Sequence, residues 1–335
     1  MKAFMINQYG KTSKGYITHI PEPEIGKNDV LVEIHAASLN PLDLKIRNGE
    51  LKLILPYKKP LILGHDVAGV IIKVGSAVQH FKVGDEIYSR PRDYRIGTFA
   101  EFIAIHEDDV ALKPKNITME EAASIPLVGL TAWQVLIEKA CLKKGEKVFI
   151  QAGSGGVGTF AIQLAKYFGA IVATTTSSTN IDFVKNLGAD VVIDYKNEKF
   201  ETILSDYDVV LNSQDSHTLE KSLSILKRGG NIFSISGPPT PAFAEEMGSP
   251  WFVKLFTYLL SWSIRTKAKQ SHVGFEFVFM RANGKQLKEI TALIESGAIR
   301  PMINKIFVLD EINEAMTYSE QGHVQGKIVI RIKGK

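Results

Sequence analysis

Short runs in which hydrophobic and polar residues alternate fill the first part of the chain, up to about residue 122. Gly, Pro and Asp separate these runs, which include "KAFMI", "VLVEIHA", "VAGVIIKVG", "DEIYS" and "FAEFIAI". A period of two places successive side chains on opposite faces of a strand, and the separating residues favour turns. The pattern predicts a domain of antiparallel β-strands.

After about residue 122 the pattern changes, and apolar β-runs alternate with helical periodicity. The run "KVFIQ" leads to a predicted helix over 156–168, and "IVATTT" leads to one over 179–187. The runs "VVIDY" and "DVVLNS" follow, then a helix over 216–227 and the run "NIFSIS". Such alternation is typical of a parallel sheet covered by helices.

Two more helical patterns begin at "NGKQLKEITALIESG", and the chain ends with the run "GKIVIRI". We expect this last strand to return to the first domain. The sequence therefore predicts an α/β protein of two domains. One is β-rich and covers 1–122, completed by 284–335; the other is a doubly wound parallel domain over 123–283.

The most apolar segment is "WFVKLFTYLLSWSI", residues 251–264, which contains Lys254 and is flanked by Pro250 and Arg265. It is too short to span a bilayer, so we expect no integral membrane segment. Its apolar residues recur at helical spacing. We favour a helix buried at a domain or subunit contact, with a substrate-facing lid or a membrane-surface helix as alternatives.

The segment "IQAGSGGVGTFAIQLAK", residues 150–166, places four glycines between a strand and a helix. Bare backbone at this point lets N–H groups approach a pyrophosphate, and the helix N-terminus favours its negative charge. A merely structural tight turn is the alternative, but further strand–helix units follow, as a dinucleotide site requires. The expected pyrophosphate contacts are Gly153, Ser154, Gly155, Gly156, Val157 and Gly158.

The end of the next β-run indicates which dinucleotide is favoured. An acidic residue about 20 positions after the glycines would bind the ribose hydroxyls of NAD. This chain reads "ATTTSSTNIDF" there, with no carboxylate before Asp182, so the sequence favours NADP(H). The expected contacts with the 2'-phosphate are Thr176, Ser177, Ser178 and Asn180. These residues also suit the capping of the next helix, and both roles can hold together.

Composition narrows the classes of partner and compartment. With 45% hydrophobic and 23% charged residues among 335, the chain is of the globular type. The net charge of +4 is spread along the chain without a basic block, so we expect no nucleic-acid partner. The single Cys141 excludes an internal disulfide, and "MKAFMINQYG" lacks a signal-peptide core, so we expect a cytoplasmic location.

An ordered set of motifs over nearly the whole chain resembles the medium-chain dehydrogenase/reductase superfamily, in its zinc-free quinone oxidoreductase and enone/alkenal reductase branch. The motifs are "SLNPLDLKIRNG", "LILGHDVAGVIIKVGSAVQHFKVGDEIYS", "IPLVGLTAW", "AGSGGVG" and "FMRANGKQLKEITALIESGAIRP". The resemblance implies a GroES-like catalytic domain interrupted by a Rossmann cofactor domain, with the active site in the cleft between them. It also implies a homodimer, because relatives commonly pair through the edge of the Rossmann sheet.

The resemblance also bears on metal binding. Zinc members of the superfamily take a cysteine ligand where this chain has Asn40, and a histidine from a segment that here reads "GHD", with His65 followed by Asp66. The position of the third ligand, in "PLVGLTAW", is apolar. A carboxamide and one histidine make a poor zinc site, so we expect no metal. We interpret His65 as a hydrogen-bonded cleft or core residue.

Without a metal, the chemistry requires a substrate that absorbs negative charge itself, such as an enone, an alkenal or a quinone. By resemblance, Asn40 lines the active site and can donate a hydrogen bond, and Thr131 lies beside the nicotinamide. The family often has a tyrosine near Asn40, whereas this chain has Leu42. Lys45, Tyr57 or water is left as the proton donor, and a surface role for either side chain is equally open.

Further cofactor contacts are expected from resemblance and topology. Tyr195 resembles a family tyrosine near the adenosine ribose or the 2'-phosphate, or it only ends a strand. Two more predicted strands end at the carboxyl edge where such sheets bind ligands. The residues at those ends are Asn212, Ser213, Ser236 and Gly237.

The sequence therefore favours a zinc-independent, NADPH-dependent reductase of quinones, enones or alkenals. The segment "NPLDLKIRNGELKLILPY" is mostly apolar, which suits a small hydrophobic substrate. The alternative is a non-catalytic protein of structural or regulatory function that keeps the fold and binds NADP(H), because a fold alone does not establish chemistry.

Overall fold

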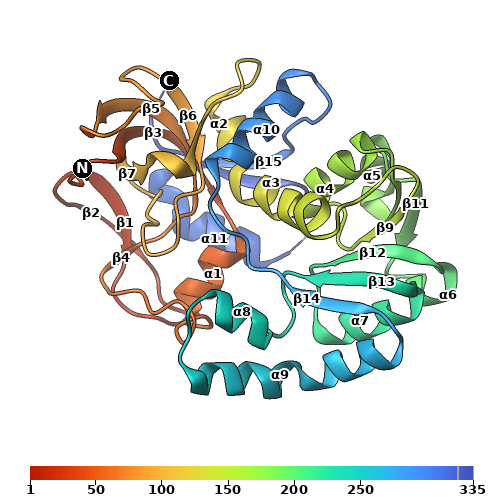
Figure 1. The fold of residues 1–335 in the computed structure, drawn as a ribbon. Helices are drawn as coiled ribbons and strands as arrows, with labels where there is room; N and C mark the ends of the chain where they lie inside the picture. The colour runs from red at the N-terminus through yellow and green to blue at the C-terminus, as the bar shows by residue number, and fades with distance from the viewer. Residues whose placement is uncertain (323, 335) are drawn as a thin grey trace. The chain divides into compact units, whose positions relative to one another are not determined.

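The computed structural model describes residues 1–322 and 324–334 (Figure 1). The chain forms two compact units, one made of Met1–Leu130 with Arg281–Lys335 and the other of Thr131–Met280. The first unit thus uses both ends of the chain, and the second is inserted between them. The boundaries expected from the sequence, 122/123 and 283/284, lie eight and three residues from those of the structure.

Within the described residues, the first unit is built on a seven-stranded sheet in the order β15-β16-β3-β5-β6-β8, with β7 also paired to β3. Neighbouring strands are antiparallel except β15 and β16, which run parallel. The strands are β3 (Asp29–Leu39), β5 (Asp66–Val74), β6 (Glu86–Ser89), β7 (Phe102–His106), β8 (Val110–Leu112), β15 (Ile303–Val308) and β16 (Lys327–Arg331). The predicted antiparallel domain and the returning last strand are both confirmed.

The long strand β3 lies at the centre of this sheet. Its residues Val30, Val32 and Ile34 are spaced by two and share one buried cluster with Val67 and Ile71 of β5. Alternate residues of a strand face the same side, so this spacing fills the core on that side. Because β3 is paired along its length, its carboxyl end is held firmly in place, and that end leads directly into the candidate site.

A small sheet and several helices complete the first unit. The sheet has the order β2-β1-β4, formed by β1 (Lys2–Ile6), β2 (Tyr16–His19) and β4 (Leu61–Ile62). The helices are α1 (Pro41–Asn48), η1 (Glu107–Asp109), α2 (Met119–Ala123), α10 (Gly284–Glu295), η5 (Leu309–Glu311) and α11 (Ile312–Glu320). Helix α3 (Pro126–Trp133) carries the chain into the second unit.

The second unit, in which every residue is described, has a six-stranded parallel sheet in the order β11-β10-β9-β12-β13-β14. Its strands are β9 (Lys147–Ile150), β10 (Ile171–Thr176), β11 (Val191–Asp194), β12 (Tyr207–Asn212), β13 (Leu226–Ser234) and β14 (Gly274–Phe277). The first strand is central and the order reverses between β9 and β12. This is the doubly wound arrangement, which binds ligands at the point of reversal.

Helices connect these strands (Figure 1). They are η2 (Gln134–Lys139), α4 (Gly156–Tyr167), η3 (Ser178–Asn180), α5 (Ile181–Asn186), α6 (Phe200–Ile203), α7 (Ser216–Lys221), η4 (Ser222–Ile225), α8 (Pro241–Glu246) and α9 (Trp251–Gln270). The predicted parallel sheet with intervening helices is confirmed.

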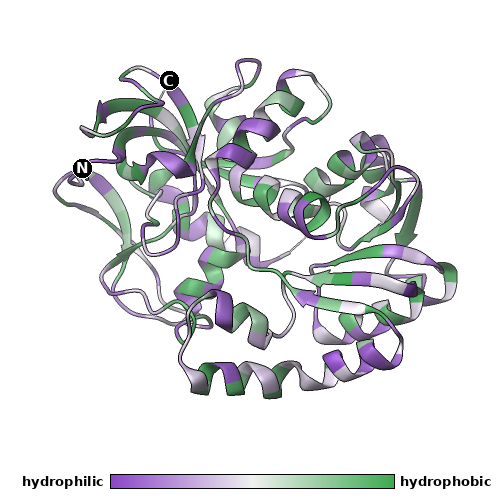
Figure 2. Cartoon of the chain, in the orientation of Figure 1, coloured by the Kyte–Doolittle hydropathy of each residue, from purple (hydrophilic) through white to green (hydrophobic). Residues whose placement is uncertain are grey.

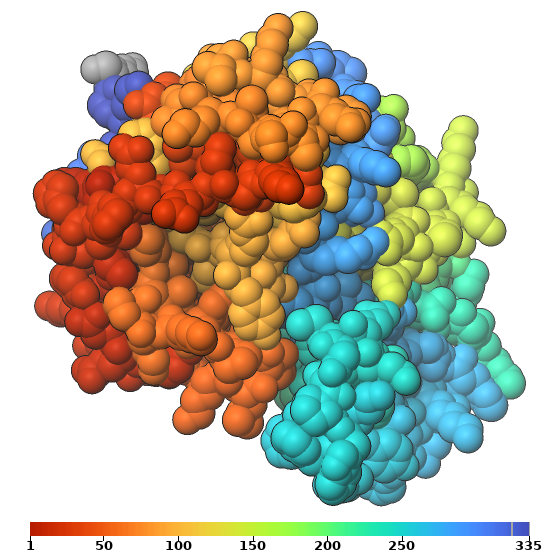
Figure 3. Space-filling view, turned by 60° about the vertical axis from the view of Figure 1, so that its left-hand side comes forward, coloured from red at the N-terminus to blue at the C-terminus, as the bar shows by residue number. Residues whose placement is uncertain are grey.

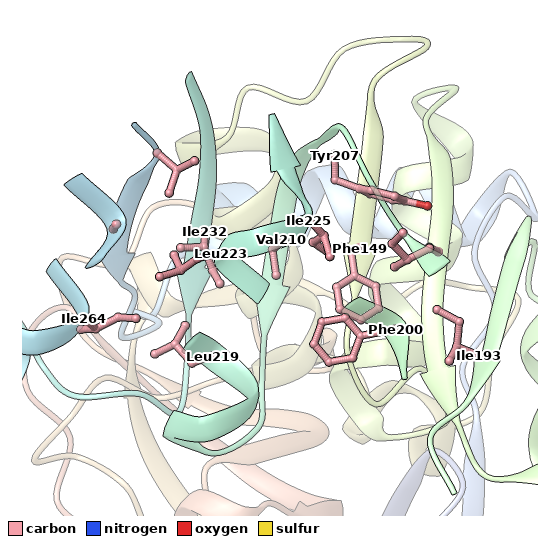
Figure 4. Close-up of a cluster of buried hydrophobic side chains, with 14 residues drawn as sticks. Phe149, Ile193, Phe200, Tyr207, Val210, Leu219, Leu223, Ile225, Ile232 and Ile264 are labelled. Carbon is pink, nitrogen blue, oxygen red and sulfur yellow. The ribbon is translucent and has the colours of Figure 1, made fainter. Parts of the chain in front are cut away.

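Aromatic and aliphatic side chains form the core on one face of this sheet (Figure 4). The ring of Phe149 in β9 lies 4.9 Å from that of Phe200 and 6.4 Å from that of Tyr207, measured between centroids. Full burial of a side chain such as Phe149 stabilises a fold by about 1.5–3 kcal/mol. This packing holds β9 rigid, and the glycine-rich turn starts at its carboxyl end.

Helix α9 differs from its prediction in length and burial. It extends to Gln270, and large apolar side chains between Trp251 and Trp262 are exposed. They are exposed because the side that faces the unit carries the small residues Thr257 and Ser261. The chain itself does not bury the apolar side of α9, and burial at a subunit contact stays a prediction. No helix in the described part of the chain is long and apolar enough to cross a membrane.

Candidate functional site

Three strand ends bring Asn40, Asp66 and Lys327 together. Asn40 follows the last residue of β3, Asp66 opens β5 and Lys327 opens β16. The register explains the meeting, since β5 and β16 both pair with the carboxyl end of β3. The three residues are only 1%, 0% and 5% exposed, so their polar atoms must find partners inside the protein.

The ammonium group of Lys327 is the centre of this cluster. It donates hydrogen bonds to Asn40 Oδ1, to the carbonyl oxygen of Leu39 at 3.2 Å and to Asp66 Oδ2 at 3.2 Å. A lysine has three N–H donors, so all three are used. The bond to Asn40 Oδ1 fixes which end of the amide is the oxygen, and the amide nitrogen therefore points the other way.

The carboxylate of Asp66 also accepts hydrogen bonds from two side chains and one backbone N–H group. Asn40 Nδ2 donates to Asp66 Oδ2 at 2.8 Å, and Ser38 Oγ donates to the same oxygen at 2.7 Å. The backbone N–H of Leu127 donates to Asp66 Oδ1 at 2.7 Å. Among residues 1–322 and 324–334, the second hydrogen of Asn40 Nδ2 has only a long contact of 3.4 Å with the carbonyl oxygen of Ser38. It is the most weakly held donor of the cluster.

Lys327 did not emerge as a site residue from the sequence. Its signal is the pair Gly326–Lys327 at the start of the apolar run "KIVI". Gly326 has a positive φ of 82°, and a Cβ there would lie 2.2 Å from the carbonyl oxygen of Met302. Only glycine fits this turn, which aims the lysine inward at the head of a strand.

His65 and Asp43 form a second buried pair. Asp43 Oδ1 lies 2.6 Å from His65 Nδ1 and accepts the backbone N–H of Gly64 at 3.0 Å. Asp43 Oδ2 accepts the backbone N–H of Asn40 at 2.8 Å, which ties the start of α1 to the same region. The other ring nitrogen of His65, Nε2, is buried and has no hydrogen-bond partner among the described residues. His65 is thus a hydrogen-bonded core residue, as interpreted from the sequence.

The residues present at this place do not fit a zinc ion. In residues 1–322 and 324–334, no group of three or more His, Cys, Asp or Glu side chains is arranged to hold a metal. Asn40 Oδ1 already binds the Lys327 ammonium, and a second cation at that oxygen would be repelled by the first. His65 Nδ1 is likewise taken by Asp43.

The two other candidate residues of this unit differ in burial. Lys45 lies in α1 and is half-buried. Tyr57 is buried, and its hydroxyl accepts the backbone N–H of Tyr94 at 3.4 Å. Burial raises the pKa of the Tyr57 hydroxyl well above its ordinary value. A higher pKa makes this group a poorer proton donor. The fourth candidate, Thr131, is buried in α3.

The glycine-rich turn joins β9 to α4. The backbone N–H of Gly153 donates to the carbonyl oxygen of Thr175 at 2.9 Å, which fastens the turn to β10. A Cβ on Gly153 would lie 2.2 Å from Thr174 Oγ1, and one on Gly158 would lie 2.3 Å from the carbonyl oxygen of Ala152. These two positions therefore require glycine, because helix, turn and strand approach each other too closely for a side chain.

The remaining residues of the turn form the N-terminus of α4. Gly155 is the N-cap, and the partly exposed Gly156 and Val157 follow it in the first turn. The first N–H groups of a helix have no acceptor within it, so they are available to an anion. Ser154, also partly exposed, precedes them. The geometry matches a pyrophosphate cradle at the carboxyl end of the first strand.

Hydroxyl groups gather where β10 ends. Ser178 Oγ donates to Asp194 Oδ2 at 2.5 Å, and Ser177 Oγ lies 3.1 Å from Thr179 Oγ1. Within the part of the chain that the structure describes, Thr176 Oγ1 is buried and has no hydrogen-bond partner. The other candidates here are Asn180, which ends η3, and Tyr195, which is exposed and donates its backbone N–H to the carbonyl oxygen of Thr176.

Asp194 is a neighbour of these hydroxyls that sequence reasoning missed. It ends β11, and the parallel register places it opposite Thr176. Besides Ser178, it accepts the backbone N–H of Lys196 at 3.1 Å and Asn197 Nδ2 at 2.7 Å. The hydrogen bond from Ser178, with those of the turn, lowers the pKa of Asp194. Its oxygens are occupied by these donors, so it is not poised to bind ribose hydroxyls.

The ends of β12 and β13 carry a buried network. Asn212 Nδ2 donates to Gln151 Oε1 at 2.6 Å, and Asn212 Oδ1 accepts Ser234 Oγ at 2.6 Å. Gln151 Nε2 in turn donates to Ser222 Oγ at 2.7 Å. The amide of Asn212 is thus used inside the sheet. Sequence reasoning missed Gln151, Ser222 and Ser234, because each hydrogen bond joins distant segments.

The candidates just beyond these strands lie at the carboxyl edge. Ser213 Oγ donates to the carbonyl oxygen of Gln151 at 3.3 Å, and Ser236 Oγ donates to that of Gln214 at 2.6 Å. The backbone N–H of Gly237 donates to Ser234 Oγ at 2.8 Å. The edge at the point of strand reversal is therefore lined by small polar groups.

A GroES-like β unit with an inserted dinucleotide-binding sheet defines the class of pyridine-nucleotide dehydrogenases and reductases. Two family descriptions match: "Alcohol dehydrogenase GroES-like domain" over residues 26–115 and "Zinc-binding dehydrogenase" over residues 187–330. The chain belongs to the medium-chain dehydrogenase/reductase superfamily, in its zinc-free quinone and enone reductase branch.

Individual relatives support this placement. The 2-methylene-furan-3-one reductase of Solanum lycopersicum is 36% identical, covering 98% of this chain and 79% of its own. The chloroplastic NADPH-dependent alkenal/one oxidoreductase of Arabidopsis thaliana is 34% identical with the same coverage. The structure of the quinone oxidoreductase from Coxiella burnetii is 34% identical, with a TM-score of 0.83 over 99% of each chain.

Proposed function

We propose that this protein is a zinc-independent, NADPH-dependent oxidoreductase that transfers hydride to a quinone, an enone or an alkenal. The observation that carries the proposal is the Lys327 ammonium bound to Asn40 and Asp66, which occupies the oxygen that a metal would need. The relatives named as alkenal/one oxidoreductase, 2-methylene-furan-3-one reductase and quinone oxidoreductase support the substrate class. The segment "NPLDLKIRNGELKLILPY", which includes α1 and is mostly apolar, supports a small hydrophobic substrate.

In this proposal the chain's own residues bind and orient. The turn at residues 153–158 holds the pyrophosphate. The hydroxyls of Ser177 and Ser178 contact the 2'-phosphate, and Ser178 gives up its hydrogen bond to Asp194 when it does so. NADPH, when bound, supplies the hydride, and the conjugated substrate takes up the charge on its own oxygen. We assign the weakly held second hydrogen of Asn40 Nδ2 to that oxygen, with Lys327 as the positioning residue that fixes the amide.

A proton completes the reduction. A quinone that receives hydride and a proton becomes a hydroquinone, and an enone becomes a saturated ketone. The raised pKa of Tyr57 disfavours it as the donor. We therefore propose that water, or Lys45 in α1, supplies the proton after hydride transfer.

The test is loss of reduced-nicotinamide absorbance when NADPH is mixed with short alkenals, cyclic enones and quinones. Steady turnover with a member of this panel is the expected result. Tight NADPH binding without turnover on any of them would instead favour a non-catalytic structural or regulatory protein, and would overturn the proposed activity.

The serines at the end of β10 give a test of cofactor preference. Replacing Ser177 and Ser178 with alanine is expected to raise KM for NADPH about 30-fold and KM for NADH less than twofold, because each of the two lost hydrogen bonds to a charged group costs roughly 1 kcal/mol. Steady-state kinetics with both cofactors checks this. Ser224→Ala, at an exposed serine of η4, serves as the control. Equal effects on both cofactors would remove the case for 2'-phosphate recognition.

Metal removal gives a test of the zinc-free chemistry. Incubation with 1,10-phenanthroline or EDTA is expected to leave kcat unchanged, because the cluster at Asn40 already holds a lysine cation. Atomic emission of the purified protein should find far less than one zinc per chain. Loss of activity on chelation, restored by added zinc, would contradict the proposal.

We also propose that the protein is a homodimer in a reducing compartment such as the cytoplasm. The lone Cys141, which is free and exposed, supports a reducing environment. Strand β14 lies at one edge of the six-stranded sheet and offers unpaired backbone groups to a second copy. Sedimentation velocity tests the dimer, and cell fractionation tests the compartment; a monomer or an organellar protein would contradict the respective part.

A further inference from the structure

Helix α9 turns its large apolar side chains away from the protein. Eight of them, between residues 251 and 262, are 45–75% exposed. They are Trp251, Phe252, Leu255, Phe256, Tyr258, Leu259, Leu260 and Trp262, which together we call the apolar face of α9. In Figure 2 the hydrophobic colour lies mainly in the first half of α9, and hydrophilic residues predominate at its C-terminal end. A contiguous row of exposed hydrophobic residues marks an interaction surface.

The rotation of α9 about its axis is fixed by the opposite side. Ile264 and Ala268 belong to the buried core cluster of the second unit. Thr257 and Ser261 are buried on the same side, and their hydroxyls donate to backbone carbonyls within the helix, at 2.9 Å and 2.7 Å. A rotation that buried the apolar face would expose Ile264 and Ala268. The exposure of the apolar face is therefore built into the fold.

The charges of α9 have one sign. The charged residues of the helix are Lys254, Arg265, Lys267 and Lys269, with no Asp or Glu between residues 251 and 270. Carboxylates approach two of them from neighbouring elements, Glu245 at 3.5 Å from Lys254 and Glu220 at 2.7 Å from Lys267. The helix thus combines a broad apolar face with a cationic border.

We propose that α9 docks the protein on an anionic lipid surface, with its apolar face at the level of the headgroups. Trp and Tyr prefer this interface, and Trp251 and Trp262 stand near the two ends of the face. Helices that lie on membranes combine such a face with Lys and Arg beside it. A second copy of the chain is a poorer occupant, because two α9 helices would bring cations of equal sign together. Figure 3 shows this part of the chain, in cyan, at the surface of the molecule.

The test is co-sedimentation of the full chain with vesicles of phosphatidylcholine, with and without phosphatidylserine. We expect at least tenfold stronger partition onto the anionic vesicles. The double variant Leu255→Glu/Leu259→Glu should lose at least tenfold of this binding. The matched control Leu53→Glu/Ile203→Glu adds the same charges at two other exposed apolar residues and should bind like the wild type. Thermal melting and NADPH titration check that each variant is folded.

Two further measurements separate lipid from protein partners. Arg265→Gln/Lys269→Gln should lower anionic binding severalfold and flatten its salt dependence. Brominated lipids should quench tryptophan emission in the wild type, and Trp251→Phe/Trp262→Phe should abolish that quenching. Wild-type protein that stays in the supernatant with anionic vesicles would overturn the proposal. A soluble dimer that Leu255→Glu/Leu259→Glu converts to monomers would also overturn it, because the face would then belong to a second copy.

Discussion

Lys327→Met is expected to lower the free energy of unfolding by about 3–5 kcal/mol, the cost of leaving a buried charge without its partner. The substitution removes the ammonium and leaves the Asp66 carboxylate buried with neutral donors only. It also frees Asn40 Oδ1, so the amide can turn. We therefore expect kcat to fall more than KM rises. Urea denaturation and steady-state kinetics measure the two effects.

Two further variants make this expectation specific. Lys333→Met removes an exposed lysine paired with Glu33 at 2.7 Å, just beyond the same strand, and should cost less than about 1 kcal/mol. Lys327→Met/Asp66→Asn removes both buried charges and should be more stable than the sum of the two single effects. If Lys327→Met were as stable and active as Lys333→Met, the buried cluster would have no role.

Gly156→Asp is expected to weaken NADPH binding by roughly 30- to 100-fold, or about 2–3 kcal/mol. Gly156 is the first residue of α4, where the first N–H groups have no acceptor within the helix and are available to an anion. A carboxylate here would stand against the pyrophosphate, and like charges a few ångströms apart repel by about this much in a partly exposed site. Titration of NADPH, followed by fluorescence, measures the affinity.

The control for this variant is Gly156→Asn, which has nearly the same size without the charge. It should weaken binding far less than Gly156→Asp, and the difference should shrink at high salt. Equal losses in both variants would mean that bulk rather than charge is excluded at this position. Unchanged affinity in Gly156→Asp would remove the pyrophosphate from this turn.

Much of the fold could be predicted because its elements carry local patterns. The alternation in β3 and the strand–helix alternation after it gave the correct classes of sheet. Element ends were less accurate. The predicted helix over 216–227 ends at Ile225, and β13 begins at Leu226, ahead of Gly229 and Gly230. Two glycines interrupt the apolar pattern by which a strand is recognised in the sequence. The strand forms here because pairing with its neighbours in the sheet outweighs the low strand propensity of glycine.

The residues of the candidate site also fall into two groups, those with a local sequence pattern and those brought together by distant parts of the chain. The glycine turn has a local signature, because Gly153 is required by a contact with the adjacent strand and Gly158 by a contact within a few residues. Lys327 lies 287 positions from Asn40. From the sequence alone, Lys327 is only a charged residue at the start of a strand. Asp194 was not predicted as a site residue for a similar reason, because only the parallel register of β10 and β11 brings it close to Ser178. Contacts set by pairing over long distances have no signal in a single sequence.

Because the first unit needs both Met1–Leu130 and Arg281–Lys335, synthesis on the ribosome imposes an order on its completion. The inserted unit has all of its residues as soon as Met280 has emerged, and domains fold as units once their residues are out. The sheet of the first unit cannot be completed at that stage, because β3 lacks its neighbour β16 along one edge until Lys327–Arg331 has also emerged. A premature stop before codon 327 would yield a finished nucleotide domain attached to an unfinished partner.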